Sequence, residues 1–381
     1  MWKSAWSRGG LGVCSLSLLS VLVWAQSPQQ LVQDAIQKQQ AGDLEGAVKE
    51  YRQFLKMAPA AATIHSNLGA ALAGLGRFEE AVPEYRAALK QSPGFTQARL
   101  NLAIAYYKMG RISDAATQLA RVHALDPKNH QAIVLLGDCY LRMGQNKDVI
   151  RLLEPEQKKD PDDLAVVYML GTAFLKDKQR EKGAALIDRI LRNGESAETH
   201  LLLGMSRFEA MEYPGAIADL TKAAEIDPSM PDVYSYLGQA QMASGDMEAA
   251  REAFEKELTL NPNDFESNVR LAVLLKQDGS YDRARQLLDR ALLVRPKDPG
   301  ALYQVGATYL AAGDMNRALS ALESLVKQYP EFLEPHVSLA QVYYRLRRKQ
   351  DGDREREIVQ KLKAEQDAQQ SKTKGEVQPR P

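Results

Sequence analysis

Cysteine and histidine are scarce in this chain of 381 residues, which has two of the former and five of the latter. Cys14 lies in an N-terminal segment that we expect to be removed, so Cys139 would remain alone and no intrachain disulfide could form. His123 and His130 flank Asp126, but no further ligand accompanies them. Because protein metal sites usually take three or four ligands, neither a metal nor another cofactor is expected.

An excess of charge of either sign is also missing, since 49 basic residues stand against 49 acidic ones. Loss of the first 25 residues would remove Lys3 and Arg8 and leave 47 basic against 49 acidic residues, a net charge near −2. A basic surface is the electrostatic requirement for binding nucleic acid. The balance of charge therefore predicts no nucleic-acid partner.

Motifs of enzymes are absent as well. The sequence has no glycine-rich phosphate loop, no nucleophile elbow and no metal-binding histidine pair with a glutamate. Because repeats fill nearly all of the chain after residue 25, no length remains for a separate catalytic domain. We expect no catalytic residues and no enzymatic activity.

The N-terminal apolar run is shorter than the roughly 20 residues that a membrane-spanning helix needs. It begins at Leu11 and ends at Trp24, behind Lys3 and Arg8, and Ala25 supplies a small residue at its end. This is the layout of a secretory signal peptide cleaved after Ala25. We expect export to the periplasm or the extracellular space, with a bacterial envelope favoured, and no stable membrane insertion after cleavage. An uncleaved anchor is the alternative.

What the sequence does contain is a strict internal period. Small residues that follow a large apolar one recur at intervals of 34 residues, with one interval of 33. A period in this range indicates a solenoid, in which each unit buries its apolar face against its neighbours. The recurring positions are Ala35, Gly69, Ala103, Gly137, Gly171, Gly204, Gly238, Ala272, Gly306 and Ala340.

Each unit is predicted to be a pair of amphipathic helices. Leu302, Val305 and Tyr309 fall at helical spacing, and Ala318 and Leu322 follow after a turn. Glycine between the helices suits a left-handed residue that ends the first helix, and proline closes most units because it cannot continue the second. The glycines are Gly42, Gly76, Gly110, Gly144, Gly245, Gly279 and Gly313.

These residues resemble the tetratricopeptide repeat, a helix–turn–helix unit. The second unit shows the pattern in Leu68, Gly69, Gly76, Ala81, Tyr85, Ala88 and Pro93. The resemblance covers about residues 28–346 and implies an all-α fold, an α–α superhelix of nine full repeats and the first helix of a tenth. It also implies that the partners are other proteins or peptide segments; it does not predict an oligomeric state.

The chain is accordingly divided into a signal peptide (1–25), tandem repeats (26–346), a charged capping helix (347–366) and a disordered tail (367–381). The units are expected near residues 28–61, 62–95, 96–129, 130–163, 164–196, 197–230, 231–264, 265–298, 299–332 and, for the first helix of a tenth, 333–346.

The pattern departs from its regular form mainly in the fourth to sixth units. Pro155 falls inside a predicted second helix and is expected to break or kink it. Lys178 and Met211 stand where glycine is expected, and Pro214 begins a second helix. These departures predict a local change of superhelix curvature between about Pro155 and Pro214, with drift that has no functional meaning as the alternative.

In proteins of the resembled family, the first helices line a concave groove that holds partner segments. For any one groove position here, the alternative is packing against a neighbouring helix. The implied groove residues are Leu100, Ile104, Tyr107, Lys108, Val134, Leu141, Arg142, Tyr168, Leu175, Lys176, Met205 and Phe208, with Tyr303, Leu310, Val337 and Tyr344 farther along.

Lys108, Arg142 and Lys176 occupy the same position in three successive units. A row of cations along the groove would suit an acidic segment or a carboxylate terminus of a partner, and an ordinary solvated face is the alternative. We therefore expect a non-enzymatic interaction scaffold of the cell envelope. The alternative is an accessory subunit that recognises substrates for an envelope enzyme or for a secretion or assembly complex.

Overall fold

The computed structural model describes residues 27–191 and 196–376. Within these ranges the chain forms twenty α-helices and no strand, which confirms the predicted all-α class. None of the described helices is long and apolar enough to cross a membrane. The expected signal peptide, residues 1–25, lies outside the described residues.

The helices alternate between a first and a second helix of each pair, and each pair packs on the next. The first helices are α1 (Pro28–Gln40), α3 (Ala62–Gly74), α5 (Thr96–Lys108), α7 (His130–Arg142), α9 (Leu164–Lys176), α11 (Ala197–Glu209), α13 (Val233–Ser244), α15 (Phe265–Gln277), α17 (Pro299–Ala311) and α19 (Leu333–Arg345). The second helices are α2 (Leu44–Met57), α4 (Phe78–Gln91), α6 (Ile112–Leu125), α8 (Asn146–Lys159), α10 (Arg180–Leu191), α12 (Tyr213–Ile226), α14 (Met247–Leu260), α16 (Tyr281–Val294), α18 (Met315–Gln328) and α20 (Lys349–Glu376).

The two helices of a pair approach closely because a small residue on the first faces a large one on the second. A Cβ atom at Gly69 would lie 2.7 Å from the ring of Tyr85, and one at Gly238 would lie 2.7 Å from the ring of Phe254. Both rings are at most 1% exposed. The recurring small residue therefore leaves the space that the second helix fills.

Residues in the left-handed region connect the helices of most pairs, as predicted. All the predicted linker glycines have a φ between 72° and 96°. Lys178, Met211 and Arg347 occupy the same place in their units with φ values of 60°, 62° and 60°. The turn geometry is thus kept even where glycine is replaced, although a side chain makes this conformation less favourable.

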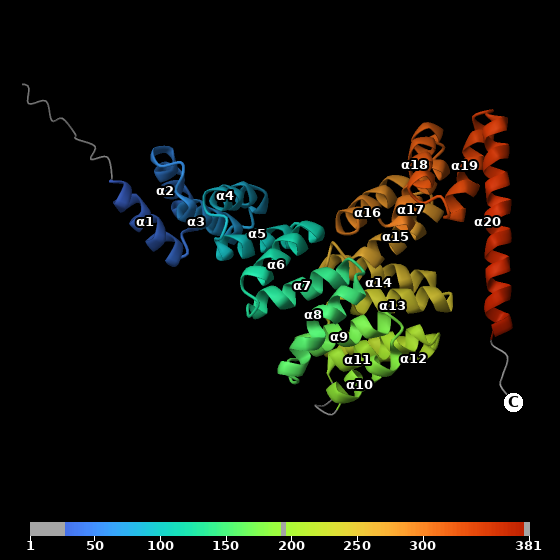
Figure 1. Cartoon of the computed structure of the whole chain (residues 1–381), viewed down its shortest axis with the longest axis horizontal. Coiled ribbons are helices and arrows are strands. Elements are labelled where there is room, and N and C mark those ends of the chain that lie inside the picture. Colours follow the sequence, from blue (N-terminus) through green and yellow to red (C-terminus); the bar gives the residue numbers. More distant parts are fainter. Residues whose placement is uncertain (1–26, 192–195, 377–381) are drawn as a thin grey trace, which may run out of the picture.

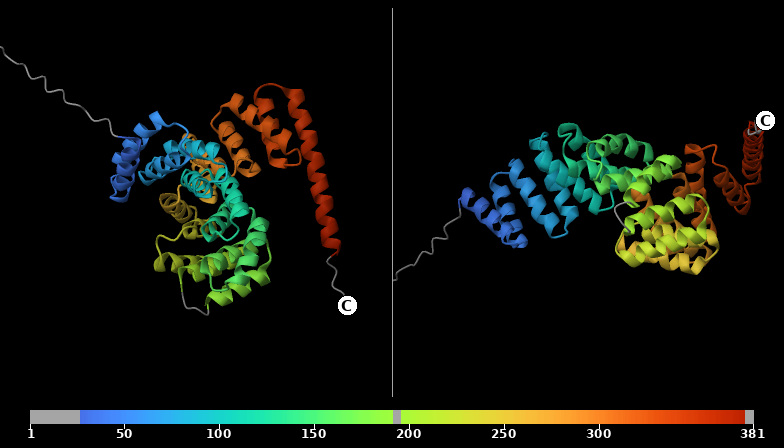
Figure 2. Two further views of the ribbon diagram at one scale, coloured as in Figure 1. Left: turned by 60° about the vertical axis from the view of Figure 1, so that its left-hand side comes forward. Right: turned by 90° about the horizontal axis from the view of Figure 1, so that it is seen from below.

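The superhelix closes one turn on itself (Figure 1). Helix α6 contacts α16, and the core that begins in α1 and α2 continues through Phe265, Ala291 and Val294. A Cβ at Gly110 would lie 2.6 Å from the Asn263 side chain, so the two parts of the chain touch closely. We call α5–α16 the closed turn, α1–α4 the N-terminal arm and α17–α20 the C-terminal arm; Figure 2 shows the arms leaving the closed turn at opposite ends.

Two parts of the expectations are wrong, the break at Pro155 and the disorder of residues 367–376. Pro155 does not break its helix, because α8 runs through it to Lys159; Pro155 and Arg151, whose carbonyl loses its donor, are both exposed, so water replaces the lost hydrogen bond. The segment 367–376 is helical rather than disordered, since α20 continues to Glu376. It is rich in glutamine, lysine and glutamate, which favour helix, and it has no proline.

Candidate functional site

The implied groove residues differ in exposure. Leu100, Leu141, Leu175 and Met205 are buried, at 8% exposure or less, in clusters between neighbouring helices. They do not line an open groove, which corrects their assignment; the first helices of successive units pack on one another through these positions. Lys108 is exposed. The half-buried ones are Ile104, Tyr107, Val134, Arg142, Tyr168, Lys176 and Phe208.

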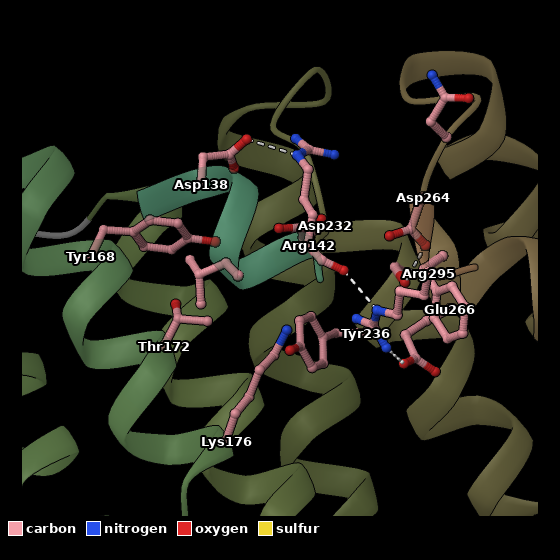
Figure 3. A pocket seen from close by; sticks show the side chains of 14 residues that line it. Asp138, Arg142, Tyr168, Thr172, Lys176, Asp232, Tyr236, Asp264, Glu266 and Arg295 are labelled. Atoms are coloured by element: carbon pink, nitrogen blue, oxygen red, sulfur yellow. Dashed lines mark hydrogen bonds and ion pairs between the residues drawn. The ribbon is translucent and has the colours of Figure 1, made fainter. Parts of the chain in front are cut away.

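The predicted basic row is interrupted. Arg142 and Lys176 line a cavity at the centre of the closed turn (Figure 3). Lys108 lies on the surface. Neither an open cationic row nor a solvated face describes these two cations. Arg142 pairs with Asp138 of its own helix, whereas Lys176 approaches Tyr236 of α13.

The cavity has a volume of about 50 Å³ and lies where α7, α9 and α13 meet the turns that precede α15 and α17. Sequence spacing places these elements in units that are far apart, and closure of the superhelix brings them together. The lining residues are Asp138, Leu141, Arg142, Tyr168, Thr172, Lys176, Asp232, Ser235, Tyr236, Asn263, Asp264, Phe265, Glu266 and Arg295.

Arg142 is held by groups from its own unit and the preceding one. Its Nε donates to Asp138 Oδ2 at 2.8 Å, and the Tyr107 hydroxyl donates to the same oxygen at 2.5 Å. The guanidinium also lies 5.4 Å from the centre of the Tyr107 ring. Burial alone would lower the pKa of Arg142, but Asp138, Tyr107 and Asp232 together outweigh burial and the pKa is raised. This cation therefore stays charged.

Arg295 joins the two ends of the closed turn. Its Nε donates to the backbone carbonyl of Arg142 at 2.7 Å, across 153 positions of the sequence. Its Nη1 donates to Glu266 Oε1 at 3.3 Å, and its guanidinium carbon lies 3.9 Å from the centre of the Phe265 ring. One side chain thus makes a charged hydrogen bond, an ion pair and a cation–π contact at this joint.

The N-terminus of α13 is capped from another helix. Asp232 precedes α13 with a φ of 69°, and its side chain makes no capping hydrogen bond. Glu257 of α14 takes that role, since its carboxylate accepts from the backbone N–H of Asp232 at 3.1 Å and of Ser235 at 3.3 Å. Glu257 is fully buried, and burial, reinforced by the negative charges of Asp264 and Asp232, raises its pKa to about 8.

Burial is also the largest influence on four other side chains that line the cavity. It raises the pKa of Tyr168, Tyr236 and Asp232. Burial would lower the pKa of Lys176, but Tyr236 and Asp232 outweigh it and the pKa is raised. The Lys176 ammonium lies 5.4 Å from the centre of the Tyr236 ring. The cavity therefore favours a charged lysine, and the charges of Arg142 and Lys176 offset part of the effect of burial on Asp232.

Cysteine and histidine side chains serve the packing. Cys139 is fully buried, as expected of an unreactive thiol, and burial raises its pKa. His65 and His336 each bond a glutamate 19 residues later and the carbonyl of a preceding proline. No group of three or more potential metal ligands occurs in residues 27–191 and 196–376.

Models of the tetratricopeptide repeat match this chain in overlapping stretches that together run from residue 35 to residue 365, at residues 72–123, 110–170 and 207–256 for one model and 35–94, 168–231, 235–301, 269–331 and 303–365 for another. The chain belongs to the tetratricopeptide repeat family. The resemblance found in the sequence is thereby confirmed, and this family generally mediates interactions between proteins. Its scaffold is typically non-catalytic.

Relatives with a curated description share only part of the chain. Superkiller protein 3 of Schizosaccharomyces pombe is 30% identical over 135 residues, 34% of this chain and 10% of that protein. Tetratricopeptide repeat protein 8 of Caenorhabditis elegans is 31% identical over 102 residues, 26% of this chain and 20% of that protein. The chain thus spans a fifth or less of the length of these relatives.

Solved structures share the fold. A tetratricopeptide repeat protein from Parabacteroides merdae has a TM-score of 0.55 and 17% identity, over 65% of this chain and 98% of that one. A chain of the APC/C hetero-tetramer Cut9–Hcn1 has a TM-score of 0.51 and 12% identity, over 89% and 87%. At these identities the likeness establishes the superhelical fold alone.

Proposed function

We propose that the chain is a non-catalytic scaffold of the cell envelope that binds segments of other proteins. The observation that carries this proposal is the reach of the family matches, which leaves almost no described residue outside a repeat. A solenoid presents an extended inner surface, and that surface is where repeat proteins bind partners. The envelope location rests on the N-terminal signal-like segment, residues 1–25.

The C-terminal arm offers the more open part of this inner surface. Val337 and Tyr344 lie seven residues apart on α19, two helical turns along the same face, and are 37% and 36% exposed. In the closed turn the corresponding positions are taken up by packing between repeats or by the cavity. We therefore assign the partner segment to the arms. Val337 and the exposed part of Tyr344, whose hydroxyl donates to Asp353 of α20, are the apolar anchors.

Affinity capture from native envelope extract tests this assignment. The bait is the chain from Gln26 onward, beside a double variant Val337→Asp, Tyr344→Ala and a control Leu125→Asp. Leu125 is also an exposed apolar residue, at 55% exposure, but it ends a second helix. The proposal expects one partner that is enriched by the parent and the control and lost with the double variant.

Other results would contradict it. If all three baits capture the partner equally, the α19 face does not bind it. If no bait captures a specific partner, the proposed scaffold function is contradicted. Mass spectrometry of the native protein tests the envelope location, because removal of a signal peptide would leave a chain that starts at Gln26. The same experiment distinguishes the alternative function as an accessory subunit. That function requires one stoichiometric partner that carries an enzymatic or secretion activity.

A further inference from the structure

Two charged side chains of the central cavity, Lys176 and Asp232, take part in no ion pair among the described residues. Arg142 pairs with Asp138 and Arg295 with Glu266. Asp264 also has no ion pair there, but its carboxylate accepts from the Ser235 hydroxyl at 2.8 Å and from the Ser267 backbone N–H at 2.7 Å. Lys176 and Asp232 influence each other electrostatically but do not come within ion-pair distance. A charge in a partly buried site without a close counter-charge is costly, so a ligand that supplies both counter-charges would be bound favourably.

A buried hydroxyl lies beside them. Thr172, on α9 one turn before Lys176, is 4% exposed, and its Oγ1 makes no hydrogen bond of good geometry, although the Tyr168 side chain lies near it. Figure 3 shows Thr172, Lys176 and Asp232 around the same space, with Arg142 above. This hydroxyl can therefore donate to a ligand in the cavity.

The position of Asp232 also indicates a task other than capping. An aspartate before a helix usually caps it with its carboxylate, but Glu257 accepts the backbone N–H groups of α13 instead. Asp232 has a left-handed φ of 69°, an uncommon conformation for a residue with a side chain. The substitute cap leaves its carboxylate available to the cavity.

The volume of the cavity limits the size of a ligand that it can hold. A water needs about 10–15 Å³ of such volume, so a cavity of about 50 Å³ has room for roughly three to five waters. A molecule of about five or six non-hydrogen atoms replaces that number of waters. A peptide segment is too large.

We propose that the cavity binds a small zwitterion of the size of free glycine or L-alanine. Its carboxylate accepts from the Lys176 ammonium and the Thr172 hydroxyl, and its ammonium donates to the Asp232 carboxylate. The ligand thereby links α9 to α13 and stabilises the closed turn. This goes beyond the proposed binding of protein segments and does not depend on it.

Isothermal titration calorimetry of the chain from Gln26 onward with glycine and L-alanine tests the proposal. A ligand of five or six non-hydrogen atoms reaches micromolar affinity at best, so a Kd between about 10 µM and 1 mM is expected for at least one of them. Asp232→Asn is the main variant, because asparagine accepts a positive φ and keeps the size while it removes the charge. It should weaken binding at least tenfold.

Two further variants make the result specific. Lys176→Met keeps the apolar stem and should also weaken binding at least tenfold, while Lys147→Met, at an exposed position of α8, should leave it unchanged. Circular dichroism establishes that each variant folds. If Lys176→Met does not fold, the conservative Asp232→Asn still decides the question.

Partial ligands separate the zwitterion from simpler ions. Acetate lacks the ammonium, glycinamide lacks the carboxylate, and each should bind at least tenfold more weakly than glycine. Acetate as strong as glycine and insensitive to Asp232→Asn would overturn the proposal in favour of an anion site. No heat with either amino acid at 10-fold the upper expected Kd, about 10 mM, would overturn it in favour of water alone.

Discussion

The N-terminal arm and the closed turn are built from the same helix pair but differ in what surrounds it. In the arm, charged residues pair on the surface, as Arg77 does with Glu45 and Glu80. In the closed turn, Arg142, Lys176 and Asp232 face a small enclosed space, and Arg295 joins units that are 153 positions apart. Apolar packing between neighbouring units is enough to form the arm. In the closed turn, polar contacts between units that are distant in the sequence are added to this packing.

The largest expected effect tests whether apolar packing is equal in the two regions. Tyr85 in the arm and Phe254 in the closed turn fill the same place against Gly69 and Gly238. Tyr85→Ala and Phe254→Ala should each cost about 3–5 kcal/mol in the free energy of unfolding, measured by urea titration.

The two substitutions should differ in how far their effects spread. Hydrogen exchange after Tyr85→Ala should speed up in α3–α5 only, because arm units contact only their neighbours. After Phe254→Ala it should also speed up in α6 and α7, which the closed turn connects to α15 and α16. If the faster exchange is confined to neighbouring helices in both variants, the distant units of the closed turn do not stabilise one another.

The second prediction concerns the buried carboxyl of Glu257. Its pKa is about 8 in the folded chain against the ordinary 4.5. Between these values the folded chain binds a proton that the unfolded chain has lost, so the stability of the protein falls as the pH rises from about 4.5 to 8. Glu257→Gln removes this titration and keeps an acceptor for α13. The variant should gain stability relative to the parent across that interval, by an amount on the order of a few kcal/mol that is complete above pH 8.

Thermal unfolding from pH 5 to pH 9 measures this difference. Glu50→Gln in the N-terminal arm is the control, because Glu50 pairs with the half-exposed Lys38 and its loss should not reproduce the gain. A difference between Glu257→Gln and the parent that stays constant with pH would refute the role of burial.

Much of the fold could be predicted from the sequence, because its determinants are local. The repeat pattern predicts that Gly69 packs against Tyr85. A glycine such as Gly76 predicts a left-handed residue in the turn between two helices. Each follows from contacts inside one unit or between neighbours, and spacing alone carries that information.

The cavity could not be predicted in the same way. Lys176 and Arg142 were recognisable as equivalent positions, but Asp232 and Arg295 reach them only after the rotation of several units has accumulated. A small change of rotation per unit would separate Arg295 from the Arg142 carbonyl, and no residue pattern specifies that rotation. The same reason explains why Leu141 and Leu175 are buried where an open groove was expected.

The third prediction breaks the joint of the closed turn. Arg295→Ala removes the hydrogen bond to the Arg142 carbonyl and the ion pair with Glu266, which should cost about 1.5–3 kcal/mol. The arms should also move apart, seen as a larger radius of gyration in solution scattering. Arg283→Ala is the control, because the exposed pair of Arg283 with Glu255 is worth less than about 1 kcal/mol. An unchanged radius of gyration in Arg295→Ala would show that apolar contacts alone close the turn.

The smallest expected effect concerns the turns between helices, where the two regions differ again. The N-terminal arm has glycine in both of its turns, whereas two of the six turns within pairs of the closed turn have Lys178 and Met211 in the left-handed region instead of glycine. Met211 is 76% exposed, so its side chain contributes little packing. Met211→Gly should relieve the backbone strain and raise the free energy of unfolding by about 1 kcal/mol, visible as a higher Tm.

Met247→Gly is the matched control for this change. Met247 is 43% exposed but begins α14, where glycine only adds freedom to the unfolded chain, so this variant should lose about 0.5–1 kcal/mol. Opposite signs at two exposed methionines would place the cause in the backbone conformation rather than in the lost side chain. A lower Tm for both variants would mean that the Met211 side chain makes a stabilising contact. Backbone strain would then not be the difference between the turns of the closed turn and those of the N-terminal arm.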